Sequence, residues 1–300
     1  MAATHHVLLA GGSGLIGAAL ADRLRTEGHR VTRLVRRDTA SADEVRWDAR
    51  SLDPTVLEGV DAVINLSGAT VGRIPWTTRY RRTLVSSRVE PTRALAEAIV
   101  AAATPPKVFI SGSAVGFYGN RPGETVSDGS ERGDGFFPDL VTAWEQASAI
   151  AAGATRVVNI RTAVVVAHGG GLAPIRILTK LGLGARFSTG EQYWPWIGLR
   201  DQVRAIIHLL DSELAGPVVL AGPTPATSFA VTYAYAREMG RPHRFVVPRF
   251  AIRLLGEAGQ RLLLDDLRVL PRRLQADGFE WTTRTIDRAV AAIDPEDRAD

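Results

Sequence analysis

The chain has 300 residues, of which 45% are hydrophobic, and it contains no cysteine. This length and composition allow a substantial buried core, and the lack of cysteine excludes disulfide bonds, thiolate nucleophiles and cysteine metal sites. The formal net charge is only +4, because 36 basic residues are offset by 32 acidic ones. The six histidines are scattered along the chain, so we expect no metal site.

The same features limit location and partners. No hydrophobic run approaches the ~20 residues of a membrane span, and residues 7–21 lack the preceding Lys or Arg of a signal sequence. We therefore expect a soluble, cytoplasmic protein with no membrane contact. The pI of 9.8 raises nucleic-acid binding as an alternative. The densest arginine cluster, between residues 79 and 93, lies on a predicted helix and is more typical of a solvated face or a cofactor-phosphate contact. We expect a small-molecule substrate and no nucleic acid.

The first residues predict a dinucleotide site. Residues 7–17 read VLLAGGSGLIG, in which a short hydrophobic run breaks into Gly11, Gly14 and Gly17 and continues as a predicted helix to Thr26. Glycines at these positions permit the tight turn, the approach of backbone N–H groups to a pyrophosphate, and close packing of helix on strand. Residues 30–35 follow as a second strand, which completes a β-α-β unit of about the ~30-residue length of this fingerprint.

The residues after the second strand favour NADP(H) over NAD. In dinucleotide sites an acid about 20 residues past the glycines binds the ribose 2′-hydroxyl of NAD. This chain instead has Arg33, Arg36 and Arg37, with no carboxylate before Asp38. Guanidinium groups suit a 2′-phosphate because they are permanently charged and form bidentate bonds. The alternative is that these arginines are only the solvated end of a strand.

Buried strands alternate with helical patterns along the first 220 residues. Helices are predicted at 85–103, 140–152 and 202–210. Strands are predicted at 7–10, 31–35, 45–47, 62–66, 108–110, 157–160 and 218–220. This alternation predicts an α/β fold, a Rossmann doubly wound parallel sheet with helices on both faces. Ligands bind in such folds at the carboxyl ends of the strands, where residues 67–69 and 111–113 fall.

Beyond residue 166 the composition changes. A glycine run at 169–171 and an aromatic cluster at 193–196 precede the last predicted strand, and prolines and short helices follow residue 223. We predict that residues 1–166 form the NADP-binding domain, completed by about 201–222. Residues 167–200 and 223–300 then form a smaller C-terminal substrate lobe, without a linker that would make it independent.

Several stretches together resemble one superfamily. The glycine turn, residues 61–69, residues 113–119 and Asp201 before a helix resemble the extended short-chain dehydrogenase/reductases. More narrowly, the chain resembles their atypical, NAD(P)-dependent epimerase-like subfamily with a C-terminal domain of unknown function. The stretches that match this subfamily are 87–92, 144–145, 169–172, 196–197, 269–274 and 278–279.

The resemblance implies a role for each matching residue. Arg36 would bind the 2′-phosphate beside Arg33 and Arg37, and Asp48 would lie near the adenine. Ser111 and Ser113 would lie beside the nicotinamide, with Arg161 under the substrate. Trp196 and Asp201 would lie on the opposite wall. Apart from the resemblance, Trp194 and Trp196 are candidates to stack on a substrate or, alternatively, to fill the seam between lobes. The pyrophosphate and ribose residues would be Gly11, Gly12, Ser13, Gly14, Leu15, Ile16, Gly17, Leu66, Ser67, Gly68 and Ala69.

One departure from the superfamily pattern bears on catalysis. The superfamily uses a tyrosine and a lysine four residues later, and the lysine lowers the pKa of the tyrosine that exchanges a proton with the substrate. The only two lysines here are Lys107 and Lys180, and neither follows a tyrosine at that spacing. Phe137 and Val141 occupy the expected positions. Ser113 and Tyr118 are the remaining candidates for the catalytic hydroxyl groups, and the structural alternatives are a loop cap and a packed aromatic ring.

Two functions of different class follow. The first is an NADP(H)-dependent oxidoreductase or epimerase-like enzyme that acts on an unidentified small substrate. The alternative is a redox sensor or interaction protein that binds NADP(H) without turnover, which the missing tyrosine-lysine pair favours. Neither the substrate nor the oligomeric state follows from the sequence.

Overall fold

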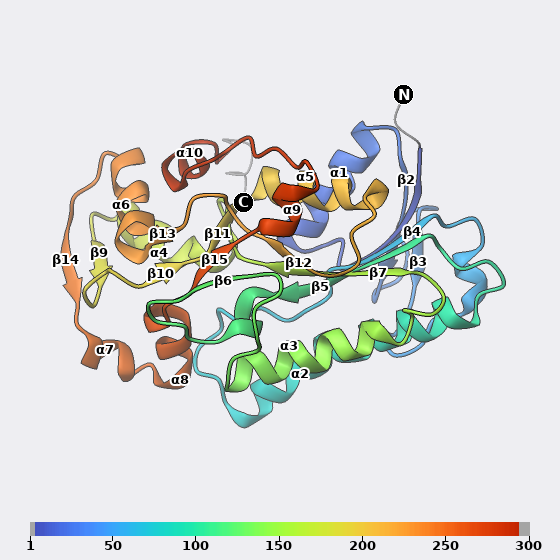
Figure 1. Ribbon diagram of the computed structural model, residues 1–300, viewed down its shortest axis with the longest axis horizontal. Helices are drawn as coiled ribbons and strands as arrows, with labels where there is room; N and C mark the ends of the chain where they lie inside the picture. The colour runs from blue at the N-terminus through green and yellow to red at the C-terminus, as the bar shows by residue number, and fades with distance from the viewer. Residues whose placement is uncertain (1–3, 294–300) are drawn as a thin grey trace.

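A computed structural model describes residues 4–293, and a parallel sheet runs through its centre (Figure 1). The sheet has seven strands in the order β12-β7-β5-β4-β1-β2-β3. The order reverses between β1 and β4, which places the topological switch point beside the glycine turn. The strands are β1 (His6–Ala10), β2 (Arg30–Val35), β3 (Glu44–Arg46), β4 (Ala62–Asn65), β5 (Val108–Ala114), β7 (Arg156–Thr162) and β12 (Gly216–Leu220).

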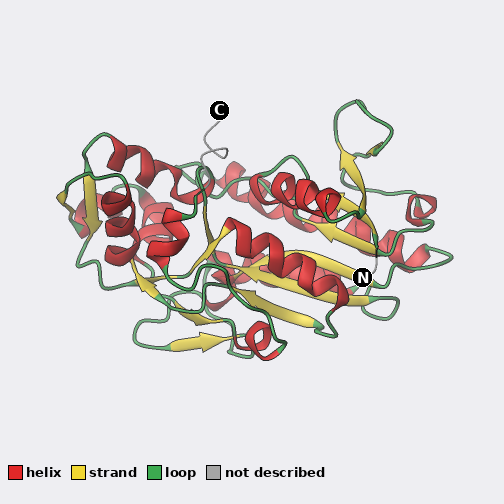
Figure 2. Cartoon of the chain, turned by 90° about the horizontal axis from the view of Figure 1, so that it is seen from above, coloured by secondary structure: helices red, strands yellow, loops and turns green. Residues whose placement is uncertain are grey.

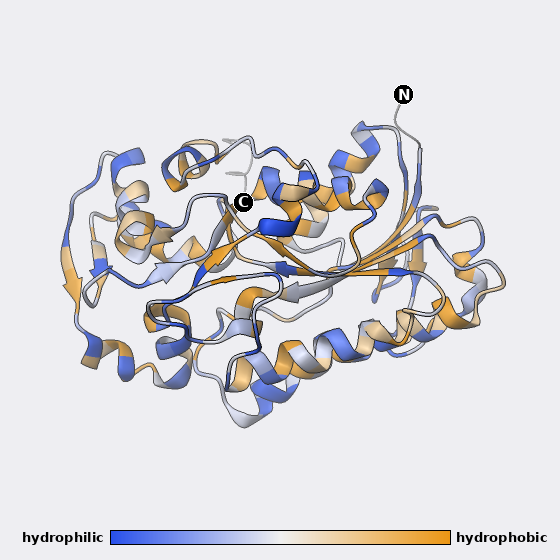
Figure 3. Cartoon of the chain, viewed as in Figure 1, coloured by the Kyte–Doolittle hydropathy of each residue, from blue (hydrophilic) through white to orange (hydrophobic). Residues whose placement is uncertain are grey.

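Helices cover both faces of this sheet. Helices α1 (Leu15–Thr26) and α5 (Leu199–Asp211) pack together on one face, and α2 (Thr78–Ala101) and α3 (Phe136–Ala149) pack together on the other (Figure 1). Successive side chains of β1 alternate between two hydrophobic cores, with Leu9 in the first and Leu8 in the second. The hydropathy colouring shows hydrophobic residues along much of the central sheet (Figure 3), as expected for strands covered on both faces. The predicted α/β Rossmann fold is confirmed.

The helices predicted at 85–103, 140–152 and 202–210 all begin earlier than the sequence predicts, and the last of them, α5, starts at Leu199. Helix α2 starts at Thr78, seven residues before the predicted start, and the Thr77 hydroxyl accepts a hydrogen bond from the Tyr80 N–H. The first turns of α2 are rich in arginine, so a hydrophobic period does not reveal them. Helix α3 starts at Phe136 instead of residue 140, and its first three residues, Phe136, Phe137 and Pro138, are all hydrophobic, so they show no helical period in the sequence.

Shorter elements gather at one end of the sheet (Figures 1 and 2). Four two-stranded sheets pair β11 with β8, β10 with β13, β14 with β9 and β15 with β6. Their strands are β6 (Thr125–Ser127), β8 (Val164–Val166), β9 (Gly184–Phe187), β10 (Tyr193–Trp194), β11 (Trp196–Gly198), β13 (Ala226–Thr227), β14 (His243–Val247) and β15 (Arg268–Leu270). The helices of this end are α4 (Ala173–Lys180), α6 (Ser228–Glu238), α7 (Arg249–Arg253), α8 (Gly256–Gly259) and α10 (Ile286–Ala291), whereas α9 (Arg272–Ala276) packs against β12 of the central sheet. Single helical turns lie at Pro54–Leu57, Val115–Tyr118, Gly170–Leu172 and Gln260–Leu264.

This end has its own hydrophobic core, which includes Trp194, Trp196, Tyr235 and Ile252. The last part of the chain nevertheless returns to the sheet, since Leu267, Val269, Leu274, Phe279 and Trp281 belong to the core of the α1 face. A lobe bounded at residues 167–200 and 223–300 therefore stays a prediction. The separate core around Trp196 supports it, and the residues from Leu267 to Trp281 join the two parts.

Candidate cofactor and active site

The glycines of the first turn divide into two structural roles. Gly11 has a φ of +81°, and a Cβ there would lie 2.6 Å from the carbonyl carbon of Leu66. A Cβ on Gly17 would collide with the carbonyl oxygen of Gly11. A Cβ on Gly14 would instead meet no atom closer than 3.5 Å. Gly11 and Gly17 are therefore required by the packing of the turn, whereas Gly14 faces open space at the N-cap of α1.

Two of the three arginines after β2 are organised by one buried acid. The Glu44 carboxylate on β3 accepts hydrogen bonds from the Arg33 guanidinium at 2.8 Å and from both terminal nitrogens of Arg37. The hydrogen bonds from Arg37 and from the Ala40 N–H hold the pKa of Glu44 below its usual value. The Glu44 carboxylate thus holds the loop after β2 in place through Arg37 and the Ala40 N–H. The sequence analysis did not identify Glu44 as part of the site.

The same arginines leave two groups without protein partners. The Nε of Arg33 is buried with no hydrogen-bond acceptor, and the Arg33 stem lies beside Gly12, where a Cβ would come within 3.3 Å of it. Arg36 is exposed, and no ion pair or hydrogen bond engages its guanidinium within residues 4–293. A buried donor without an acceptor is costly in a folded protein. An anionic ligand at the glycine turn would satisfy it, so the residues present fit the 2′-phosphate end of NADP(H).

The other predicted cofactor residues line the same edge of the sheet. Ser13 and Leu15 are exposed, Ile16 is half-buried and Gly12 is buried. The Asp48 carboxylate accepts the N–H groups of Arg50 and Ser51, which forms a tight turn after β3. In the loop after β4, the Ser67 N–H donates to the Asn65 side chain and the Ala69 N–H donates to the Ser87 hydroxyl. Ser111 is fully buried in β5, and its hydroxyl reaches only the Gly112 carbonyl, at 3.3 Å.

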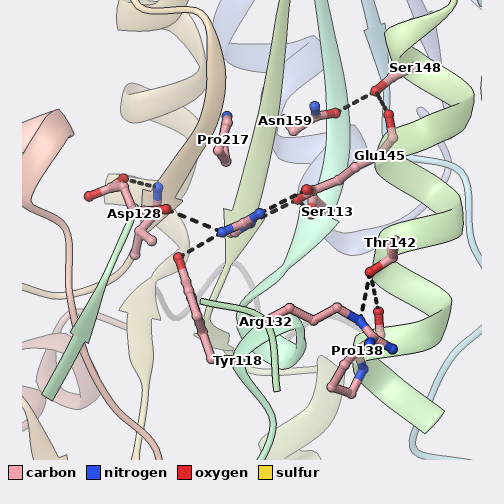
Figure 4. A network of polar contacts seen from close by, with 12 residues as sticks. Ser113, Tyr118, Asp128, Arg132, Pro138, Thr142, Glu145, Ser148, Asn159 and Pro217 are labelled. Atoms are coloured by element: carbon pink, nitrogen blue, oxygen red, sulfur yellow. Dashed lines mark hydrogen bonds and ion pairs between the residues drawn. The ribbon is translucent and has the colours of Figure 1, made fainter. Parts of the chain in front are cut away.

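A polar network occupies the carboxyl ends of β5 and β7 (Figure 4). The Ser113 hydroxyl donates to the Glu145 carboxylate at 2.6 Å, and the Arg161 guanidinium donates to both carboxylate oxygens at 2.8 Å. Arg161 also donates to the Tyr118 hydroxyl at 3.1 Å and lies 3.5 Å over the Phe117 ring. The structure thus brings together Ser113, Tyr118 and Arg161, which were predicted separately, and joins them through Glu145.

Burial limits the ability of the Tyr118 hydroxyl to exchange a proton in this network. Its side chain is fully buried, and desolvation raises the pKa of its hydroxyl despite the Arg161 hydrogen bond. Its hydroxyl oxygen accepts from Arg161, so the phenol is held in place by that cation. The Ser113 side chain lies beside the same cation and is 5% exposed. The catalytic roles of Ser113 and Tyr118 stay predictions, and the geometry gives Tyr118 a supporting position behind Arg161.

Asp128 connects this network to the C-terminal part of the chain. Its carbonyl accepts from Arg161, and its carboxylate accepts the N–H groups of Val219 on β12 and Arg273 on α9. Asp128 is 3% exposed. No feature of the sequence around residue 128 distinguished it, because its partners lie 91 and 145 residues away.

The positions expected for a tyrosine-lysine pair are packed with hydrophobic groups. Val141 is fully buried in a cluster with Leu140, Leu84 and Trp144 on α2 and α3. The Phe137 ring meets the Trp76 ring edge-on, with centroids 5.1 Å apart. Neither position holds a titratable group, in agreement with the sequence.

The residues predicted to contact a substrate from the second lobe are engaged in packing. The Trp196 indole donates to the Thr224 carbonyl and covers Gly222, and the Trp194 ring lies against Phe187 with centroids 5.7 Å apart. This favours the interpretation that both indoles fill the seam. The Asp201 carboxylate is fully buried and accepts four hydrogen bonds from the N–H and hydroxyl groups of Thr282 and Thr283. These hydrogen bonds anchor the segment at Thr282 and Thr283 to α5, which carries Asp201.

One cation at this site belongs to the arginine cluster at residues 79–93, for which the sequence left a solvated face or a cofactor-phosphate contact open. Arg88, on α2, donates to the Ala69 carbonyl at 2.9 Å and to the Leu84 carbonyl at 3.0 Å. Ser87 and Arg88 belonged to a stretch that matched the subfamily, but their spacing gave no sign that the side chain reaches the loop after β4. Within the described residues, no cluster of His, Asp or Glu could hold a metal, and no helix is long and hydrophobic enough to span a membrane.

Fold and site define an NAD(P)-binding protein of the epimerase class, and comparison with known proteins agrees. Residues 7–222 match the NAD dependent epimerase/dehydratase family, and residues 247–293 match a domain of unknown function (DUF1731). The chain belongs to this epimerase/dehydratase family. It is 40% identical to an epimerase family protein of Mycobacterium leprae over 291 residues, which cover 95% of this chain and 94% of the relative.

Solved structures give the same assignment. The crystal structure of the human epimerase family protein SDR39U1 with NADPH matches with a TM-score of 0.89 and 30% identity, over 96% of this chain and 98% of the human one. A nucleoside-diphosphate sugar epimerase from Corynebacterium glutamicum matches with a TM-score of 0.80 and 29% identity. That match covers 96% of this chain and 58% of the other.

Proposed function

We propose that this protein is an NADP(H)-dependent oxidoreductase or epimerase that acts on a small substrate at the carboxyl ends of β4, β5 and β7. The observation that carries the proposal is a pair of donors beside the glycine turn that lack protein partners, the buried Nε of Arg33, whose charge is otherwise paired with Glu44, and the exposed guanidinium of Arg36. A 2′-phosphate satisfies both, whereas the 2′-hydroxyl of NAD carries no charge for them. The human relative crystallised with NADPH supports the same choice of cofactor.

The polar network of Ser113, Glu145 and Arg161 supports the second part of the proposal, the position of the substrate site. When bound, the cofactor supplies hydride chemistry at its nicotinamide ring. Glu145 holds the Ser113 hydroxyl at the end of β5, and Arg161 neutralises Glu145 from the other side. The Ser113 oxygen keeps its lone pairs for a substrate hydroxyl, so Ser113 orients the substrate. The proton exchanged with the substrate comes from a substrate group or from water near Ser113, because Tyr118 is buried behind Arg161.

Calorimetric titration tests the cofactor assignment. We expect NADPH to bind at least tenfold more tightly than NADH, because a charge-assisted hydrogen bond contributes about 1.5–3 kcal/mol. Arg36→Ala removes most of that preference and leaves NADH affinity unchanged. Arg30→Ala, at the amino end of β2, is the matched control and leaves both affinities unchanged. Equal affinities for NADPH and NADH in the unmodified protein would contradict the assignment.

A second function has one specific observation in its favour. The apolar packing at Phe137 and Val141 removes the superfamily's usual proton route, as a protein that senses NADP(H) without turnover would allow. Absorbance at 340 nm with carbonyl substrates detects an oxidoreductase, and chromatographic detection of epimers formed from nucleotide sugars detects an epimerase, which regenerates its cofactor and shows no net NADPH oxidation. A rate of either reaction that falls at least tenfold in Ser113→Ala supports the enzyme, and tight NADPH binding with neither reaction on any substrate supports the sensor.

A further inference from the structure

Arg88 lies where the ends of two neighbouring strands meet. A Cβ on Gly68, in the loop after β4, would come within 3.1 Å of the Arg88 Cζ. The guanidinium also lies 5.3 Å from the centroid of the Trp144 ring, and that ring covers Gly112 near the end of β5. Arg88 is therefore sandwiched between the Ser67–Ala69 loop and Trp144, at the edge of the sheet where ligands bind in this fold.

The position of this side chain is fixed by a hydrogen-bonded scaffold from three elements. The Thr92 hydroxyl receives the Asn65 amide of β4 and the Trp144 indole N–H of α3, and it donates to the Arg88 carbonyl of α2. The two hydrogen bonds from the guanidinium to the Ala69 and Leu84 carbonyls complete the arrangement. Such a preorganised cation loses little conformational freedom when it binds an anion or a polar oxygen.

The charge of Arg88 has no counter-ion in the described part of the chain. Both of its hydrogen-bond acceptors are neutral carbonyls, and it takes part in no salt bridge there. Burial lowers the pKa of the guanidinium to about 10. Arg88 is half-buried, and a partly desolvated cation that lacks a carboxylate is costly for stability, so a bound group is expected to compensate for it.

Helix α3, which packs on α2, has no lysine at position 141, where the resemblance places the superfamily's lysine. Val141 stands at the lysine position, and Trp144, one turn further along α3, carries the Arg88 guanidinium on its ring. We propose that Arg88 binds the oxygen atoms of the nicotinamide half of NADP(H) and supplies, from α2, the positive charge that a lysine on α3 supplies elsewhere. This inference rests on the proposed binding of NADP(H).

Calorimetry with two ligands tests the inference. NADPH contains both halves of the cofactor, whereas 2′,5′-ADP contains only the adenosine and its two phosphates. Arg88→Met removes the charge and keeps the length of the side chain. We expect it to weaken NADPH binding at least tenfold and to change 2′,5′-ADP binding by less than twofold. Arg88→Lys keeps the charge and restores part of the NADPH affinity.

Controls distinguish the possible failures. Arg82→Met, on the exposed side of α2, changes neither affinity. NADPH binding by Arg88→Met within twofold of the unmodified protein overturns the inference, and so does an equal loss for both ligands in a variant with unchanged circular dichroism. If Arg88→Met does not fold, Arg88→Lys carries the test, because it loses the planar fork and must still weaken NADPH more than 2′,5′-ADP. Failure of the unmodified protein to bind NADPH overturns the proposed function itself.

Discussion

At the scale of single residues, identical residue types in one motif have different tasks. Gly11 and Gly17 are required because backbone atoms of Leu66 and Gly11 occupy the space of their missing Cβ atoms. Gly14 has no such neighbour and leaves its side of the turn open to a ligand. The three arginines divide similarly, since Glu44 binds Arg33 and Arg37 and leaves Arg36 unpaired.

Two glycine substitutions therefore have opposite consequences. Gly14→Val adds a branched side chain in open space, so we expect the melting temperature to fall by only a few degrees while NADPH fluorescence enhancement is lost. Gly17→Val places its Cβ on the Gly11 carbonyl and abolishes soluble expression. Retained NADPH binding in Gly14→Val would show that the open space is not the pyrophosphate site.

At the scale of elements, the face of α3 that packs on α2 is hydrophobic and carries no reactive group. Its inner face presents Leu140, Val141 and Trp144 to α2, and Phe137 supports the loop that carries Trp76. The charged residue that remains on α3 at the site, Glu145, is paired with Arg161 of β7. At the positions that the resemblance assigns to the superfamily's tyrosine and lysine, α3 therefore makes an apolar contact, and its carboxylate at the site forms a salt bridge.

Restoring the lysine alone is therefore unfavourable. Val141→Lys buries an ammonium group in a hydrophobic cluster next to the ring that carries Arg88, and the nearest carboxylate on α3, that of Glu145, is already paired with Arg161. We expect a loss of more than about 3 kcal/mol in the free energy of unfolding, measured in urea. Gln146→Lys, on the exposed face of the same helix, is the control and changes stability by less than about 0.5 kcal/mol. A stable Val141→Lys variant would mean that the cluster opens to solvent.

At the scale of the whole molecule, buried carboxylates hold distant segments together. Asp128 joins β7, β12 and α9 through hydrogen bonds, and Asp201 fixes the segment at Thr282 and Thr283 to α5. The smaller core around Trp196 thereby stays attached to the sheet on two sides.

Asp201 makes this attachment dependent on pH. Burial alone raises the pKa of its carboxyl, but the hydrogen bonds from Thr283 and Thr282 outweigh burial and lower it. Because the pKa in the folded protein lies below the unfolded value of about 3.9, the stabilisation is present above about pH 4 and is lost as the pH falls through the folded pKa. We expect Asp201→Asn to cost roughly 2–3 kcal/mol at pH 7.

The difference between Asp201→Asn and the unmodified protein should shrink at pH 3 and below, as followed by urea unfolding across pH. Asp22→Asn, whose carboxylate is exposed, is the control and changes stability little at either pH. A cost for Asp201→Asn that stays constant from pH 7 to pH 3 would show that the charge of Asp201 contributes nothing.

The sequence by itself determined the features that depend on neighbouring residues. The glycine turn, the order of strands and helices in the first 220 residues, and the absence of a tyrosine-lysine pair all follow from local spacing, because strand and helix periods and glycine turns are local properties. Local spacing also predicted which strand ends carry Ser67, Ser111 and Ser113.

Only the tertiary structure decided which of the candidate residues are free to act. Glu44 forms salt bridges with Arg33 and Arg37, and Arg161 donates a hydrogen bond to Tyr118. Trp194 and Trp196 pack in the smaller hydrophobic core. The place of Arg88 at the site is apparent only from the tertiary structure, in which its guanidinium contacts the loop after β4 and the Trp144 ring of α3. These outcomes depend on contacts between residues far apart in the chain, and burial and charge pairing across such distances are set by the packing of elements and leave no periodic signal in the sequence.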